Sequence, residues 1–507
     1  MTAAEAEPER LDVVTEPHDR AFLGHPKGLG FLAVVEGCER FSYYSMQTLL
    51  ALSLVNYLLL PEHFGSVWGL GWLQQHWYGG KQGQVLASAI FGNYTGLVYV
   101  TPILGGIAAD RWLGRRGALV AGGVIMSIGH FLMAIQPAFL LALLCLIVGV
   151  GLFKGNIASQ VGELYGPNDL RRAMAFQIFY IAIQISVIAA PLISGTAGEK
   201  LGWHYGFGCA GVVMVLGLLL YLRGRQYLPE DKPRTAIAPA LGSLAKWLLA
   251  LAVLVAMAFL LPKWLALALV ATVLLGALIA WMGRLTKSER VSVITIILLI
   301  PALAVSLLPN QEMSNAYLVW GDQHFQLTYG GFRIPTTWLI TLDSIVSFVT
   351  LVGITWFWKW RSDNGHWEPD ELGKLIIGAV FTIIGALCLY IAALTQGAGK
   401  ISLFWPVMFH IFNDLGFGHI LPVSLALVSK IAPKHMLATA VGIYYLAFFL
   451  ANQIVGTVGG WYSTMPTPQF WLVHVGGAVV GLAAFVFFKV FLSDRFSDDR
   501  REGAAPA

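Results

Sequence analysis

The sequence predicts an all-α polytopic membrane protein with fourteen membrane-spanning helices. Of its 507 residues, 57% are hydrophobic and only 12% are charged, whereas soluble globular domains carry about 25% charged residues. Apolar segments of roughly the length that crosses a bilayer recur along the whole chain. They are 31–60, 85–109, 117–135, 137–162, 173–195, 205–222, 241–261, 264–283, 292–319, 336–358, 374–394, 401–429, 436–460 and 469–492.

The loops between these segments alternate in charge. One set contains only five basic residues, which are Lys81, Lys200, Lys263, Arg333 and Lys400. The other set contains seventeen, the first being Arg111 and the last Lys434. Because cytoplasmic loops are enriched in Lys and Arg, we expect the second set to be cytoplasmic. An even number of spans then places both termini in the cytoplasm.

Residues 1–28 lack the basic start and the short apolar core of a cleaved signal peptide. We expect a cytoplasmic tail there, with the first span as the insertion signal, and a second tail at 493–507. The four cysteines lie in apolar segments without metal or redox spacing, so no disulfide, metal site or cofactor is predicted. The net charge of +4 comes mostly from loops and does not indicate nucleic-acid binding.

The first apolar segment contains a stripe of charge. Glu36, Glu39, Arg40 and Tyr43 have the spacing i, i+3, i+4 and i+7, so they share one helix face, with Tyr44 beside it. Each charge facing lipid would cost about 2.5–3.5 kcal/mol. The stripe is therefore expected to face a protein interior or a watery cavity, where it marks a path for protons or polar solutes. The alternative is a static Glu–Arg pair that holds helices together.

Further polar residues interrupt the fourth and fifth segments. Lys154 lies deep in 137–162, and either glutamate of the first segment is its natural counter-ion, unless the lysine snorkels to the interface. Tyr180 and Gln184 lie one turn apart in 173–195. They are candidates for substrate contacts or for hydrogen bonds between helices.

The second half of the chain contains three acidic residues at membrane depth. Glu312 follows Gln311 in the ninth apolar segment, and Asp343 interrupts the tenth. Asp414 lies four residues after His410, so the two side chains share a helix face and predict either a proton relay or a structural hydrogen bond. For Asp343 we weigh a pocket-facing role against a fixed hydrogen bond to a neighbouring helix.

The apolar hairpin 241–283 lacks a polar face and lies between two polar stretches. We interpret it as a peripheral pair inserted between two six-helix bundles. The predicted organisation, in chain order, is a tail at 1–28, an N-terminal bundle at 29–223, a linker with the hairpin at 224–290, a C-terminal bundle at 291–492 and a tail at 493–507. The stretch 105–116, with its Gly-Gly, Asp-Arg and Gly-Arg-Arg spacing, resembles the signature loop of the major facilitator superfamily. That resemblance implies the major-facilitator fold.

The motif Glu36-x-x-Glu39-Arg40-Phe41-x-Tyr43-Tyr44 resembles the first-helix motif of the proton-dependent oligopeptide transporter family. Other parts of the chain also resemble the family, namely Tyr99 in Tyr-Val-Thr-Pro-Ile-Leu-Gly-Gly, Lys154, Phe179-Tyr180 and Lys430-Ile431-Ala432-Pro433. The inserted hairpin resembles the bacterial members, which have fourteen helices. The resemblance covers roughly residues 25–492.

The resemblance implies that a charge cluster couples transport to protons and that a pocket binds the substrate. The proton-coupling residues would be Glu36, Glu39, Arg40 and Lys154, with Asp343 and Glu312 in the second half. The substrate-binding residues would be Arg40, Tyr43, Tyr44, Tyr99, Lys154, Tyr180, Gln184, Gln311 and Asp343. Departures from the family pattern include Gln47, Gln184, Ser186, Asp343 and Phe417. They indicate that the amine-binding half of the pocket is rearranged.

The predicted function is proton-coupled import of di- and tripeptides by alternating access in a bacterial inner membrane. The alternative on the same fold is transport of another small carboxylate-bearing solute or amino-acid derivative. An enzyme is not predicted, because the sequence contains no HExxH, clustered metal ligands or Gly-x-Ser-x-Gly motif. The expected partners are small peptides, protons and the lipid bilayer. No nucleic acid and no obligate protein partner is expected.

Overall fold

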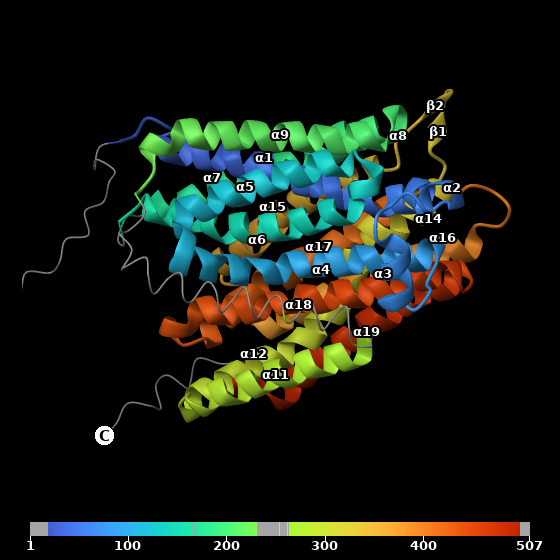
Figure 1. Ribbon diagram of the computed structural model, residues 1–507. Coiled ribbons are helices and arrows are strands. Elements are labelled where there is room, and N and C mark those ends of the chain that lie inside the picture. Colours follow the sequence, from blue (N-terminus) through green and yellow to red (C-terminus); the bar gives the residue numbers. More distant parts are fainter. Residues whose placement is uncertain are drawn as a thin grey trace, which may run out of the picture.

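The structure, a computed structural model, describes residues 19–166, 169, 171–230, 253, 261 and 263–496. Long helices lie side by side with similar axes (Figure 1). The long helices of the first group are α1 (Lys27–Ser53), α4 (Gly83–Ala108), α5 (Gly114–Met133), α6 (Phe139–Glu163), α7 (Arg171–Ala190) and α9 (Trp203–Gly224). Those of the second are α12 (Lys287–Ser306), α15 (Trp338–Asp363), α16 (Glu371–Thr395), α17 (Phe404–Ile431), α18 (Leu437–Val458) and α19 (Thr467–Phe491).

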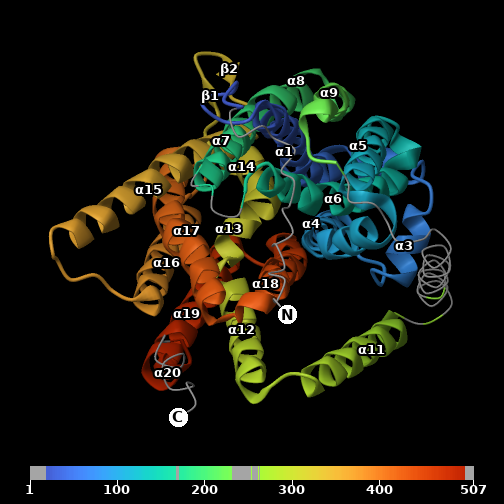
Figure 2. The same cartoon turned by 90° about the vertical axis from the view of Figure 1, so that its left-hand side faces the viewer.

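The two groups of helices lie next to each other when the protein is viewed along the helix axes (Figure 2). In the first group α5 packs on α6 and α1 packs on α9, and in the second α16 packs on both α17 and α19. Helix α4 packs against α18, and α7 packs against α15, so these pairs join the groups. The predicted fold class of two six-helix bundles is confirmed.

The number of spans agrees with the prediction as far as the structure describes the chain. Eleven helical stretches in the described residues are long and apolar enough to cross a bilayer, and one of them, Gly83–Met133, contains both α4 and α5. Counting that stretch as two helices and adding α1, whose polar residues lower its hydropathy, gives thirteen. The predicted span 241–261 lies almost entirely outside the described residues.

Helix α11 (Lys263–Gly283) is the second helix of the predicted hairpin. It lies at the periphery of the molecule (Figure 2). Most of its side chains are exposed, and they are almost all apolar, as expected for a helix that faces lipid on most sides. Helix α11 therefore contributes no wall to a cavity between the two bundles.

The segment predicted as one helix at 292–319 is broken. Helix α12 ends at Ser306, the short α13 (Leu308–Glu312) follows, and a π-helical turn (Met313–Tyr317) leads into α14 (Leu318–His324). Within that turn Asn315 has φ −118° and ψ −113°, and the Glu312 carboxylate accepts a hydrogen bond from the backbone N–H of Ala316. Irregular backbone at membrane depth requires such compensation.

The shorter elements gather mostly at the end of the bundle where α1 ends. They are a π-helical turn (Leu54–Leu58), α2 (Pro61–Phe64), α3 (Leu70–His76), α8 (Thr196–Leu201), α14 and a hairpin of two-residue strands, β1 (Thr328–Tyr329) and β2 (Phe332–Arg333). The strands are a small departure from the all-α prediction. The π-helical turn Ala109–Leu113 joins α4 to α5, and α20 (Ser493–Phe496) follows α19.

Candidate functional site

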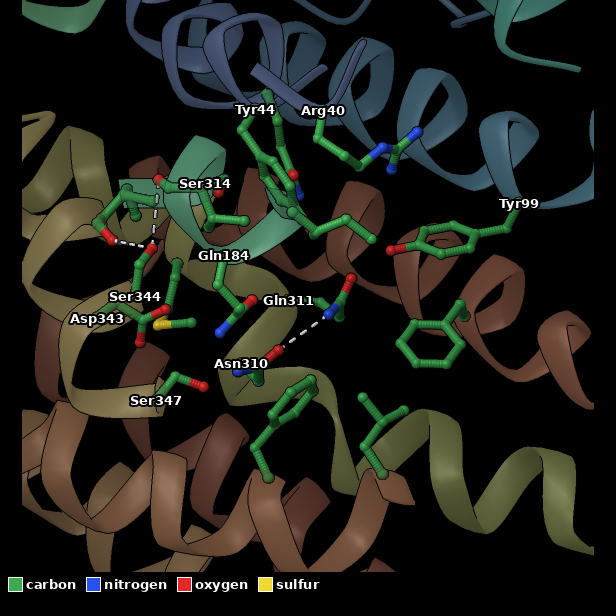
Figure 3. Close-up of a pocket in the computed structure, with 18 of the residues that line it drawn as sticks. Arg40, Tyr44, Tyr99, Gln184, Asn310, Gln311, Ser314, Asp343, Ser344 and Ser347 are labelled. Atoms are coloured by element: carbon green, nitrogen blue, oxygen red, sulfur yellow. Dashed lines mark hydrogen bonds between the residues drawn. The ribbon is translucent and has the colours of Figure 1, made fainter. Parts of the chain in front are cut away.

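A cavity of about 370 Å³ lies between the two bundles, within the ~300–1,000 Å³ range of small-molecule sites. Helices of both bundles supply its walls (Figure 3). Nine residues of the predicted site line it: Glu36, Arg40, Tyr44, Tyr99, Lys154, Tyr180, Gln184, Gln311 and Asp343. Three others, Glu39, Tyr43 and Glu312, are buried away from it.

The charged stripe of α1 forms a compact ion-pair cluster at the cavity wall. The Nε of Arg40 lies 2.5 Å from Oε2 of Glu39 and 3.4 Å from Oε1 of Glu36. A second hydrogen bond of 2.7 Å joins Nη2 of Arg40 to Oε1 of Glu39. All three side chains are buried. Burial strengthens these attractions, because little water competes for the charges.

Lys154 on α6 faces the same cavity without an ion pair. Among the described residues no carboxylate lies within 4.0 Å of its Nζ, which instead rests 5.2 Å from the ring centre of Tyr99 and 6.0 Å from that of Tyr43. This differs from the expected pairing with Glu36 or Glu39, because Arg40 already engages both carboxylates. Cation–π contacts stabilise the ammonium group and leave its hydrogen-bond donors available for a ligand.

Tyr43 was predicted to contact the substrate, but it lies beneath the cavity surface with only 3% of its area exposed. Its ring is 4.9 Å from the guanidinium carbon of Arg40. Tyr43 therefore lies between the two cations and supports both, while its neighbour Tyr44 reaches the cavity. A position one residue further along a helix is rotated by about 100°.

The opposite wall combines amides and hydroxyls of the second bundle and of α7 with apolar side chains. Gln311 donates from Nε2 to Oδ1 of Asn310 at 3.0 Å and accepts from Nδ2 of Asn452 at 3.2 Å. Figure 3 shows Asn310 and Gln311 near Gln184 and facing the cavity. Asn452 is a functional candidate that sequence reasoning missed. The only signal for it was the pair of amides Asn452-Gln453 in an apolar segment.

Asp343 on α15 supplies the carboxylate of this wall. Its Oδ1 lies 2.9 Å from Nδ1 of His410, and Nε2 of the same imidazole lies 2.8 Å from the hydroxyl of Tyr317. The expected pair of His410 with Asp414 on the same helix is therefore wrong. The imidazole of His410 bonds instead to the Asp343 carboxylate on the neighbouring helix, and this bond holds Asp343 at the cavity wall.

Glu312 lies outside the cavity in a separate polar cluster. Its carboxylate accepts from Nδ2 of Asn315 at 2.9 Å and from the backbone N–H of Ala316 at 3.1 Å, and it lies 3.4 Å from Nε2 of His474. Asn315 also accepts a hydrogen bond from Ser88 on α4. The cluster thus joins the two bundles. His474 was missed, because a histidine inside an apolar segment gives no indication of its partner.

Hydrogen bonds between the bundles gather at the end where α8, α14 and the β-hairpin lie. The carboxylate of Glu199 on α8 accepts from the backbone N–H groups of Thr336 and Thr337, both at 2.8 Å, just before α15 begins. The indole of Trp338 donates to Thr196 at 2.8 Å. A carboxylate suits this position, because the first N–H groups of a helix lack partners and its N-terminus favours negative charge. No pattern in the sequence points to Glu199.

A family model described as the POT family matches residues 116–470. The chain belongs to the POT family. Among its relatives, Peptide transporter YePEPT of Yersinia enterocolitica is 27% identical over 476 residues, which cover 88% of this chain and 89% of the relative. The Di-/tripeptide transporter of Lactococcus lactis subsp. cremoris is 26% identical over 501 residues, covering 94% and 97%.

Solved structures of this family match almost the whole length of this chain. A crystal structure of peptide transporter POT in complex with sulfate is 27% identical and has a TM-score of 0.78. The match covers 93% of this chain and 96% of the transporter in the crystal. A structure of a variant of that transporter in complex with alafosfalin has the same TM-score and coverage. These findings identify a multi-pass membrane protein of a transporter family with bacterial members.

Proposed function

We propose that this POT-family protein is a proton-coupled symporter that imports di- and tripeptides by alternating access. The observation that carries the proposal is the placement of opposite charges across one cavity. Arg40 and Lys154 lie on one wall, and Asp343 lies on the wall formed by the second bundle. A zwitterionic peptide needs this arrangement, because its carboxylate and its ammonium group must each meet the opposite charge. The names of the relatives support the same substrate class.

In this proposal the peptide carboxylate binds Arg40 and Lys154. The Nη1 of Arg40 has no hydrogen-bond partner among the described residues, and Lys154 has no carboxylate partner there. Both groups therefore have donors to offer without breaking an existing ion pair. Tyr44, Tyr99 and Tyr180 line the space between and offer hydroxyl groups to the peptide.

Charge balance couples the proton to the peptide. When Glu36, Glu39, Arg40 and Lys154 are all ionised, the cluster has no net charge. A proton on Glu36, the carboxylate of the pair that reaches the cavity, leaves the cluster with a net charge of +1, which a peptide carboxylate neutralises. Proton and peptide thus favour each other's binding, because an uncompensated charge at membrane depth is costly.

The proton gradient supplies enough free energy for accumulation. One proton moving inward across ~100 mV provides about 2.3 kcal/mol. At ~1.4 kcal/mol per tenfold concentration ratio, this supports a ratio of roughly 40. A pH gradient adds to that value, and a zwitterionic peptide itself carries no net charge.

Alternating access requires that the end closed by Glu199 opens and the other end closes. We assign the α8 end to the outside, because the loops at the opposite end contain the excess of basic residues. Both termini are then cytoplasmic, and the protein lies in the inner membrane of a bacterium. Residues 29–223 and 291–492 are proposed as the two moving bundles, with 224–290 as their linker.

Purified protein in liposomes tests this function. With an inwardly directed proton gradient, the vesicles should accumulate radiolabelled dialanine, and a protonophore should abolish the accumulation. Unlabelled tripeptide should compete with dialanine, and free alanine should compete weakly. Accumulation of a small carboxylate-bearing solute that dipeptides fail to inhibit would instead support the alternative substrate class.

A further inference from the structure

Asp414 on α17 is a buried carboxyl group that the proposed transport cycle has not used. Only 1% of its surface is exposed, and neither of its oxygens has a hydrogen-bond donor among the described residues. An ionised carboxylate in such a position is costly, because neither water nor a cation compensates its charge. His410 lies one turn earlier on the same face of α17 and bonds Asp343 on the adjacent α15 at 2.9 Å, so the Asp343 carboxylate lies beside Asp414.

Two ionised carboxylates can only accept hydrogen bonds, so neither can satisfy the other. One proton between them would supply the missing donor. The surroundings agree with this placement. His410 is satisfied when neutral, because its Nδ1–H donates to Asp343 at 2.9 Å and its Nε2 accepts from the Tyr317 hydroxyl at 2.8 Å. A proton moved to His410 would leave Asp414 without any donor.

We propose that Asp343 and Asp414 share one proton at neutral pH, so that the pair has a single negative charge and binds the ammonium group of a peptide. This inference rests on the proposed function and gives the amine end of the substrate its site. Asp343 lines the cavity and contacts the ammonium group, while Asp414 acts through Asp343 as a positioning residue. A doubly ionised pair would instead leave one charge uncompensated after a single ammonium group has bound.

The charged and titratable groups around the pair do not offer Asp414 another partner. Those that line the cavity opposite are Glu36, Arg40 and Lys154 on α1 and α6, Tyr180 on α7, and Tyr444 and Tyr445 on α18. Behind the pair are His410 and Tyr317, and Cys388 on α16 packs with Phe409 in the same apolar core. Arg40 is held by Glu39, and Glu312 of the second bundle is engaged by His474.

Infrared difference spectroscopy detects the shared proton directly. In wild-type protein at neutral pH, we expect a carbonyl band of a protonated carboxylic acid that Asp414→Asn lacks. Asp363→Asn is the matched control, since it removes an aspartate from the solvent-exposed end of the same helix as Asp343. A wild-type spectrum without any carbonyl band that Asp414→Asn lacks would place the proton elsewhere and overturn the proposal.

Dialanine affinity provides an independent test of the donor that Asp414 supplies. Asparagine can donate a hydrogen bond to Asp343 as a protonated acid does, whereas leucine of similar size cannot. We expect Asp414→Leu to weaken binding at least roughly tenfold more than Asp414→Asn, the equivalent of one hydrogen bond to a charged group. N-acetyl-dialanine, which has no ammonium group, should not distinguish the two variants. Equal affinities of both variants for dialanine would contradict the shared proton, whereas failure of the wild type to bind any dipeptide would reject the proposed function itself.

Discussion

Arg40 and Glu39 are adjacent in the sequence and form a two-point ion pair, with Nε to Oε2 at 2.5 Å and Nη2 to Oε1 at 2.7 Å. The pair fixes the plane of the guanidinium group at the cavity wall. It also leaves Nη1 without a partner among the described residues. Glu39 therefore acts as the support of Arg40, while Glu36, at 3.4 Å, is the more weakly held carboxylate.

Replacement of Arg40 tests the carboxylate site. Lysine lacks the planar fork and cannot contact Glu39 at two points and a peptide at a third. We expect Arg40→Lys to weaken dialanine binding by roughly 10- to 100-fold, the range of a lost hydrogen bond between charged groups. Isothermal titration calorimetry with dialanine and with its C-terminal amide makes the comparison. Equal losses for the two ligands would remove the carboxylate assignment.

Lys154 is expected to be essential for coupling. Lys154→Gln leaves the cluster with a net negative charge when both glutamates are ionised, so it repels a peptide carboxylate. We predict that concentrative uptake of dialanine into liposomes is lost. Lys359→Gln, which changes a lysine with 75% of its side chain exposed, serves as the control and should transport normally. Normal concentrative uptake by folded Lys154→Gln protein would exclude Lys154 from the cluster.

Much of the fold and the α1 side of the site could be predicted from the sequence, because both depend on the spacing of residues within single helices. Apolar length predicted the spans, and helical spacing placed Glu36, Glu39 and Arg40 together. The contacts of the second bundle could not be predicted in this way. The partner of His410 is Asp343 on another helix, 67 positions away in the chain. Spacing along α17 alone favoured Asp414 instead.

Glu312 illustrates the same limit at a single residue. Its neighbour Gln311 lines the cavity, whereas Glu312 faces His474 and the irregular turn that follows α13. One residue along a helix turns a side chain by about 100°. A pattern of acidic and amide residues indicated the region correctly but not which side chain would reach the cavity.

The structure predicts that Glu312 stabilises the broken helix. Glu312→Leu removes the acceptor of Asn315 and of the Ala316 N–H, and each buried donor left without a partner costs about 1–3 kcal/mol. The melting temperature in detergent should fall clearly. Glu312→Gln should lower it less, because the amide oxygen still accepts both bonds. Unchanged melting temperatures together with an altered pH profile of uptake would instead make Glu312 a proton carrier.

Glu199 should control closure of the α8 end. Glu199→Ala removes a carboxylate that accepts two hydrogen bonds of 2.8 Å from backbone N–H groups, each worth about 1.5–3 kcal/mol. Spin labels on the exposed positions Glu62 and Tyr329 report the separation of the bundles at that end. We expect pulsed electron resonance to show a larger population of long distances in the variant. An unchanged distance distribution would mean that other contacts keep this end closed.

A proton on the α1 charge cluster is proposed to drive peptide accumulation. The most direct test measures dialanine uptake into liposomes with wild type and Glu36→Gln, each with and without an inward proton gradient. Glutamine at position 36 mimics the protonated acid permanently. We predict that the variant still exchanges peptide across the membrane at equal concentrations but no longer accumulates it when the gradient is imposed. Gradient-driven accumulation by Glu36→Gln at the wild-type level would contradict the claim.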